Sequence, residues 1–173
     1  LVADANWEDF QDADAGVWKG EQFLGQKVLR LATLISWAEV YDMTLILEMK
    51  CHGNREYRSA ELLASSLRKT PKANIIVSSF DIDFLRYFRT FAPHIPLASV
   101  HNFLPEDIYF LKTELAIEAV HLDSDLISAS TDVTVFHQQG IKIRAWTVND
   151  PSRASDLFDL GVDMVMSDYP EQI

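Results

Sequence analysis

The stretch Leu45-Ile46-Leu47-Glu48-Met49-Lys50 joins a short apolar run to a carboxylate and an ammonium group. An apolar run of this length predicts a buried strand. Because side chains alternate across a strand, Glu48 and Lys50 should project to one side and Met49 to the other. The segment therefore predicts an acid and a base on one face at the C-terminal end of a strand, where parallel α/β folds bind ligands. Glu48 and Lys50 alone could equally form an ordinary surface ion pair. The remaining sequence is needed to distinguish a ligand-binding pair from a surface pair.

The composition describes an ordinary globular protein with an acidic surface. The chain has 173 residues, of which 48% are hydrophobic, and its net charge is −11. That length predicts one domain with a sizeable core, and the charge argues against nucleic acid and anionic membranes as partners. Cys51 is the single cysteine, so no intrachain disulfide can form, which fits a reducing, cytoplasmic compartment. No apolar run reaches membrane-spanning length.

Downstream of the opening stretch, predicted strands and helices alternate on an even period. The strands are predicted to begin at residues 44, 74, 97, 119, 142 and 164, so the later spacings are 23, 22, 23 and 22 residues. A short and even alternation of this kind indicates parallel strands with right-handed crossovers. The predicted strands cover 44–49, 74–79, 97–100, 119–122, 142–147 and 164–167, and the helices cover 59–69, 81–91, 105–115, 131–139 and 151–160.

Several of these boundaries carry the expected capping residues. Asp81 and Asp150 are suitable N-caps, and Pro151 fits the first helical position. Gly140 and Gly161 follow predicted helix ends, where glycine is favoured. The local signals therefore agree with the strand and helix assignment.

The even spacing predicts an α/β fold, specifically a β/α (TIM-type) barrel. Such a barrel has eight strands and about 250 residues, so this chain supplies about six of eight parallel βα units and the barrel is incomplete. An open six-stranded sheet also satisfies the count, but no G-x-G-x-x-G loop follows any strand. We interpret residues 1–173 as a single domain, with an aromatic insertion loop over 1–30 and βα units over 31–173, beginning with a helix at 31–41.

Barrel sites are built from residues that follow the strands. Glu48 suits a hard divalent ion such as magnesium or calcium, and Lys50 beside it suits a phosphate, but one carboxylate does not complete a metal site. The histidines lack zinc-site spacing. His121, within a strand, is expected to be a hydrogen-bonded core residue, whereas Arg144 requires a buried acid or water if it faces inward. The further strand-end candidates are His52, Ser78, Ser79, Phe80, His101, Asn102, Asp123, Ser124, Trp146, Thr147, Asn149, Ser167 and Asp168.

Four stretches resemble the glycerophosphodiester phosphodiesterases, from the middle of that family's sequence to its C-terminus. They occur in the family's order over almost the whole chain. The D-A-G-x-W loop is matched at 14–18, the E-I-K strand at 48–50, the S-S-F strand end at 78–80, and the W-T-V-N and closing G-V-D-x-x-x-T-D-x-P signatures at 146–149 and 161–170.

The resemblance implies a barrel enzyme that hydrolyses glycerophosphodiesters to glycerol 3-phosphate and an alcohol in glycerophospholipid metabolism. It further implies that Glu48 is one ligand of a divalent metal, Mg or Ca, and that Lys50 lies near the phosphate. Trp146 and Phe80 would form the walls of the glycerol pocket. A metal ion and an ammonium group would stabilise charge on the phosphoryl oxygens. The expected partner is thus a small phosphodiester.

The sequence also departs from the family pattern. The H-R-G and E-x-D motifs, with the two histidines of the acid and base steps, have no counterpart here. We therefore expect the catalytic histidines upstream of Leu1, in a longer chain, and expect residues 1–173 alone to be inactive. Leu29-Arg30 replaces the usual P-T before the helix at 31, and Ser167 replaces a threonine.

Two other functions remain open. One is an inert binding or regulatory module that keeps the pocket without the catalytic residues. The other is a related barrel phosphodiesterase resembling the phospholipase D toxins, but the lack of cysteine pairs argues against a secreted toxin.

Overall fold

The computed structural model describes residues 4–51, 54–68 and 73–173. The chain forms two compact units, Leu1–Met43 and Thr44–Ile173. The second unit contains a six-stranded sheet in which neighbours in sequence are neighbours in space and every pairing is parallel. Its strands are β1 (Leu45–Glu48), β2 (Ile75–Ser79), β3 (Leu97–His101), β4 (Ala119–Asp123), β5 (Lys142–Trp146) and β6 (Met164–Val165).

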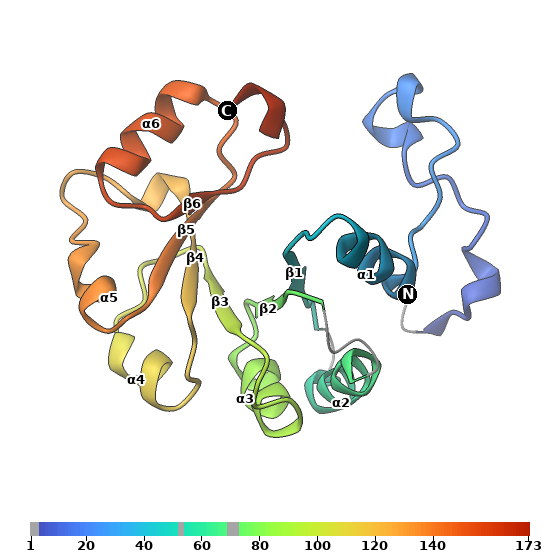
Figure 1. Cartoon of the computed structure of the whole chain (residues 1–173), viewed down its shortest axis with the longest axis horizontal. Helices are drawn as coiled ribbons and strands as arrows, with labels where there is room; N and C mark the ends of the chain where they lie inside the picture. The colour runs from blue at the N-terminus through green and yellow to red at the C-terminus, as the bar shows by residue number, and fades with distance from the viewer. Residues whose placement is uncertain (1–3, 52–53, 69–72) are drawn as a thin grey trace. The chain divides into compact units, whose positions relative to one another are not determined.

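Five helices connect these strands and lie on one side of the sheet. Figure 1 shows the strands in an arc with the helices along its outer side. The sheet is thus a curled half-barrel, which confirms the predicted incomplete β/α barrel with six parallel strands. The helices are α2 (Glu56–Leu67), α3 (Ile82–Phe91), α4 (Ile108–Thr113), α5 (Thr134–Gln138) and α6 (Pro151–Asp159).

Capping explains where several helices begin and end. The carboxylates of Asp81 and Asp150 accept from the backbone N–H groups of Phe84 and Ser152, so both predicted N-caps are confirmed. Gly140 and Gly161 have φ angles of +65° and +94°, the left-handed conformation expected after a helix.

Four predicted boundaries were wrong. Helix α2 begins at Glu56 and not at 59. Helix α4 begins at Ile108 and not at 105, because Asp107 accepts from the N–H of Phe110 at 2.7 Å and caps it. Helix α5 begins at Thr134 and not at 131, after a turn in which Asp132 accepts from the Thr134 N–H. Strand β6 ends at Val165, so Ser167 belongs to the loop that follows.

The apolar core of the second unit has two layers. The larger layer lies between sheet and helices and includes the fully buried Phe84, Leu85 and Phe88 of α3. The concave side carries a smaller cluster of Ile76, Ala98 and Ala119, against which Ile46 packs.

In the first unit, Asp14 organises the loop that was matched to the family's D-A-G-x-W segment. Its carboxylate accepts backbone N–H bonds from Gly16 and Val17, both at 2.8 Å, and from Gly25 at 2.6 Å. These three bonds lower the pKa of Asp14, Gly25 first, because they stabilise the charged carboxylate. A Cβ atom at Gly16 would lie 2.1 Å from the carbonyl oxygen of Phe23, so the loop requires glycine there.

The unit ends with helix α1 (Leu31–Val40), which confirms the helix predicted at this position. Its N-cap residue, Arg30, makes no side-chain capping bond, as expected from the replacement of the usual P-T. Among the helices of the described ranges, none has the length and apolar character needed to cross a bilayer.

Candidate active site

A cavity of about 530 Å³ opens at the C-terminal ends of the strands in the second unit. Its lining comes from all six strands or the residues directly after them. The polar lining residues are Glu48, Lys50, Ser78, His121, Thr147, Ser167 and Asp168, and the apolar or aromatic ones are Ile46, Phe80, Val100, Trp146 and Met166. This is the end of the sheet at which β/α barrels bind substrates.

Glu48 and Lys50 lie together at the edge of this cavity. The Lys50 Nζ is 3.5 Å from the Glu48 Oε1, and 70% and 36% of the two side chains remain exposed. The alternation predicted from the opening stretch is thereby observed, since both residues line the cavity. An exposed pair of this kind contributes little to stability, so both groups remain accessible to a ligand.

Phe80 and Trp146 meet across the cavity. Phe80 directly follows β2 and Trp146 ends β5, with two strands of the sheet between them. Their ring centroids are 5.8 Å apart at an interplanar angle of 83°, an edge-to-face contact. The curl of the sheet therefore brings together two aromatic side chains that are 66 residues apart in the sequence.

Two buried hydrogen-bond donors of the cavity have no partner among the described residues. They are the Ser78 hydroxyl and the Trp146 Nε1–H. A buried polar group without a partner costs about 1–3 kcal/mol. Such groups are tolerated where a ligand or an ordered water satisfies them.

The loop after β5 and the loop after β6 are bonded to each other. The Asn149 Oδ1 accepts from the Ser167 hydroxyl at 3.0 Å and from the Asp168 N–H at 2.9 Å, while its Nδ2 donates to the Asp168 carboxylate at 3.1 Å. This bonding gives a physical reason for the spacing of the W-T-V-N and closing S-D segments. It also holds Ser167 and Asp168 against the cavity.

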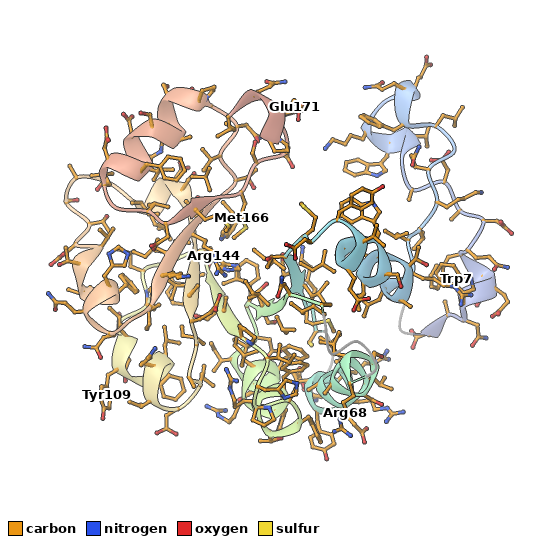
Figure 2. The ribbon with its side chains drawn as sticks, viewed as in Figure 1. Trp7, Arg68, Tyr109, Arg144, Met166 and Glu171 are labelled. Atoms are coloured by element: carbon orange, nitrogen blue, oxygen red, sulfur yellow. The ribbon has the colours of Figure 1, made fainter. Side chains whose placement is uncertain are left out.

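Arg144 lies on the concave side of the sheet and has two side-chain hydrogen-bond partners. It is 4% exposed, and its Nη2 donates to the Glu118 Oε1 at 2.5 Å while its Nη1 donates to the His121 Nε2 at 3.2 Å. Figure 2 shows Arg144 and Met166 on the side of the strands away from the helices. His121 is buried and hydrogen-bonded, as expected from the sequence, but it also lines the cavity.

His101, a candidate for substrate contact, does not line this cavity. It is buried, and its Nε2 lies 2.9 Å from the Ser99 hydroxyl. Burial lowers the pKa of His101 to about 4. Asn102, Asp123 and Ser124 are also absent from the cavity lining, and His52 falls outside the described residues.

The described residues do not by themselves form a complete metal site. Within the ranges 4–51, 54–68 and 73–173, no group of three or more His, Cys, Asp or Glu side chains could hold an ion. Glu48 offers carboxylate oxygens of the kind that magnesium and calcium prefer, but these ions take six or more oxygen ligands. Glu48 therefore fits one ligand position and no more.

Comparison with known proteins agrees with this geometry. A sequence model of the glycerophosphoryl diester phosphodiesterase family matches residues 1–172. The chain belongs to this family. The Bacillus subtilis protein YhdW, whose name assigns it provisionally to the same enzymes, is 28% identical over 183 residues, covering all of this chain and 72% of its own length. A glycerophosphodiester phosphodiesterase of Caldanaerobacter subterraneus is 25% identical and is covered over 71% of its length.

A solved family structure matches the fold of the whole chain. It is an Oleispira antarctica phosphodiesterase in complex with the product sn-glycerol-3-phosphate, with a TM-score of 0.92 and 25% sequence identity. The match covers 100% of this chain and 70% of that one. The family and these relatives support the enzyme class, a glycerophosphodiester phosphodiesterase.

Sequence reasoning selected Glu48, Lys50, Phe80 and Trp146, and the structure brings all four to one cavity. Their roles toward metal and substrate stay predictions. The same reasoning missed the cavity position of His121 and the partner of Arg144, Glu118. For Arg144, the available signal was its position two residues before Trp146 in β5. That spacing puts the arginine and the indole on the same face of the strand.

Proposed function

We propose that this cavity binds a glycerophosphodiester and that the enzyme hydrolyses it to sn-glycerol 3-phosphate and an alcohol. The observation that carries the proposal is the joint position of the Glu48–Lys50 pair and the Phe80–Trp146 rings on one cavity. The product complex of the Oleispira antarctica relative supports the choice of substrate class. The substrates would be deacylated glycerophospholipids, and the reaction would belong to lipid metabolism.

The chain's own residues suggest how the substrate is held. The Lys50 ammonium would bind the phosphoryl oxygens and stabilise their charge as the water oxygen bonds to phosphorus and the bond to the alcohol oxygen breaks. The attacking water gives up one proton and the leaving alcohol oxygen takes up one, so the step is balanced. The rings of Phe80 and Trp146 would pack against the glycerol carbons, which fixes the orientation of the diester relative to Lys50.

We further propose that a divalent ion, Mg or Ca, takes part, with Glu48 as one ligand. When bound, such an ion supplies positive charge that stabilises the phosphoryl group. The remaining ligands would have to come from outside the described residues, since those form no complete group. The carboxylate of Glu48 is available for this role because it is exposed at the edge of the cavity.

The test is hydrolysis of sn-glycero-3-phosphocholine by the full-length protein, with release of sn-glycerol 3-phosphate measured before and after metal chelation. We expect activity that is lost on chelation and restored by adding back magnesium or calcium, and restored less in Glu48→Gln. Activity that survives chelation would contradict the metal proposal alone. Binding of sn-glycerol 3-phosphate without any turnover would contradict hydrolysis and favour the inert binding module.

A further inference from the structure

A buried hydrogen-bonded chain determines the protonation state of His121. Arg144 donates to Glu118 on one side and to the His121 Nε2 on the other. Because a guanidinium group has only donors and stays protonated, the His121 Nε2 must be the acceptor in this bond. A neutral imidazole that accepts at Nε2 carries its proton on Nδ1. The contact with Arg144 therefore selects the Nδ1–H tautomer.

The same environment keeps the ring uncharged. Burial, then the positive charge of Arg144, and then His101 lower the pKa of His121 to about 3. At neutral pH the residue therefore presents a neutral N–H donor, not a cation. The geometry with Arg144 leads to the same conclusion independently, since a protonated ring would have no acceptor nitrogen for the guanidinium group.

This donor lines the same cavity as two other hydrogen-bond donors. His121 lines the cavity, and among the described residues the structure records Arg144 alone as a side-chain partner of its ring nitrogens. The Ser78 hydroxyl and the Trp146 Nε1–H of the same cavity are buried and also lack a partner within the described ranges. Three neutral donors around one cavity suit a ligand that carries several acceptor oxygens.

We propose that His121 binds the glycerol part of the substrate by donating its Nδ1–H to a glycerol hydroxyl oxygen, and that Arg144 and Glu118 are positioning residues that hold it in this tautomer. The inference rests on the proposed function of the cavity. It names a specificity-determining residue that was expected from the sequence to be part of the core.

The burial of His121 favours the glycerol hydroxyls over the phosphate. Lys50 lies beyond the end of β1 and its side chain is 70% exposed, whereas His121 lies within β4 and is buried. Ile46 and Val100 line the cavity as well, so the deeper surface is apolar apart from its neutral donors. A charged phosphate would lose hydration there, and the nearby charge of Arg144 is already paired with Glu118, while Lys50 offers an exposed cation at the edge.

Two amide substitutions of different length separate ligand binding from a structural role. In His121→Asn, the side-chain amide nitrogen falls near the position of Nδ1, so the donor is kept and the acceptor for Arg144 is lost. In His121→Gln, the amide reaches the position of Nε2, so the contact with Arg144 is kept and the donor toward the cavity is lost. A ligand role and a structural role therefore predict opposite orders for the two variants.

The experiment is calorimetric titration of the full-length protein with sn-glycerol 3-phosphate and, separately, with inorganic phosphate. We expect His121→Gln to raise the Kd for sn-glycerol 3-phosphate about tenfold, the effect of one lost hydrogen bond, with that for inorganic phosphate unchanged. His121→Asn should bind close to wild type although its Tm falls. Binding by His121→Gln that equals wild type, or affinities that follow Tm, would overturn the inference.

A spectroscopic measurement tests the positioning residues. The ¹⁵N chemical shifts of the His121 ring should show a protonated Nδ1 and an unprotonated Nε2 in the wild type, and a mixture of tautomers in Arg144→Met. Protonation at Nε2 in the wild type would overturn the assignment. If wild type binds sn-glycerol 3-phosphate with the expected variant order but does not hydrolyse sn-glycero-3-phosphocholine, the proposed hydrolysis fails while the role of His121 stands.

Discussion

Lys50 carries the positive charge that the cavity offers to an anionic ligand. We expect Lys50→Met to lower kcat/KM for sn-glycero-3-phosphocholine about 100- to 1,000-fold, the usual effect of removing one donor from a developing oxyanion. Its stability should change by less than about 0.5 kcal/mol, because the side chain is exposed and its ion pair with Glu48 is weak. Steady-state kinetics and denaturant titration measure the two effects.

The control for this substitution is Lys142→Met. Lys142 is also exposed, but it begins β5 at the opposite end of the strand. We expect its kcat/KM to match that of wild type. If the two variants lost activity to the same degree, a general effect of surface charge would explain the result and Lys50 would have no particular role.

His101 should make stability depend on pH. Its pKa is about 4 in the folded protein because the ring is buried, whereas the ordinary value is 6.5. The unfolded chain thus binds more protons between these two values, so stability falls as the pH is lowered through this window. From about pH 7 to about pH 5, this residue should reduce the free energy of unfolding by about 2 kcal/mol.

His101→Gln tests this prediction because the glutamine amide can still reach the Ser99 hydroxyl while it does not titrate. Urea denaturation at the two pH values should show a smaller loss of stability in this variant than in wild type. Equal losses in wild type and His101→Gln would show that protonation of His101 does not oppose folding.

At the scale of an element, helix α3 connects the stability of the fold to the site. Asp81 caps the helix through the Phe84 N–H at 2.9 Å and directly follows Phe80, which lines the cavity. We expect Asp81→Ala to lower the free energy of unfolding by about 1 kcal/mol and to raise KM, because the position of Phe80 becomes less well defined. Thermal unfolding and steady-state kinetics check the two outcomes.

Asp81→Asn is the matched control, since asparagine caps helices about as well as aspartate. It should restore both stability and KM. If Asp81→Asn were as destabilised as Asp81→Ala, the carboxylate charge and not the capping bond would be the stabilising feature.

At the scale of the whole molecule, the concave face of the half-barrel has a cavity, but the described residues form no complete metal site there. We expect a protein limited to residues 1–173 to show no enzyme-like hydrolysis of sn-glycero-3-phosphocholine, even with magnesium or calcium present. The reason is that no three metal-binding side chains gather among the described residues and that the H-R-G and E-x-D motifs have no counterpart in 1–173. Product release at an enzyme-like rate would contradict this expectation.

Much of the fold was determined by short-range signals in the sequence. The even spacing of apolar runs predicted six parallel strands, and Asp81, Asp150, Gly140 and Gly161 marked helix ends that the structure has. The alternation within 45–50 placed Glu48 and Lys50 on one face. These predictions succeed because strand parity and helix capping depend on residues only a few positions apart.

The tertiary structure alone decided which distant residues meet. His121 faces the cavity and His101 does not. The alternation of side chains within β3 and β4 does not predict this difference, because the pairing register between the strands decides which face of each strand is turned toward the cavity. The edge-to-face contact of Phe80 with Trp146 and the choice of Glu118 as the partner of Arg144 both require the curl of the sheet. The unpaired donors of Ser78 and Trp146 likewise depend on everything that packs around them, and no local pattern in the sequence contains that information.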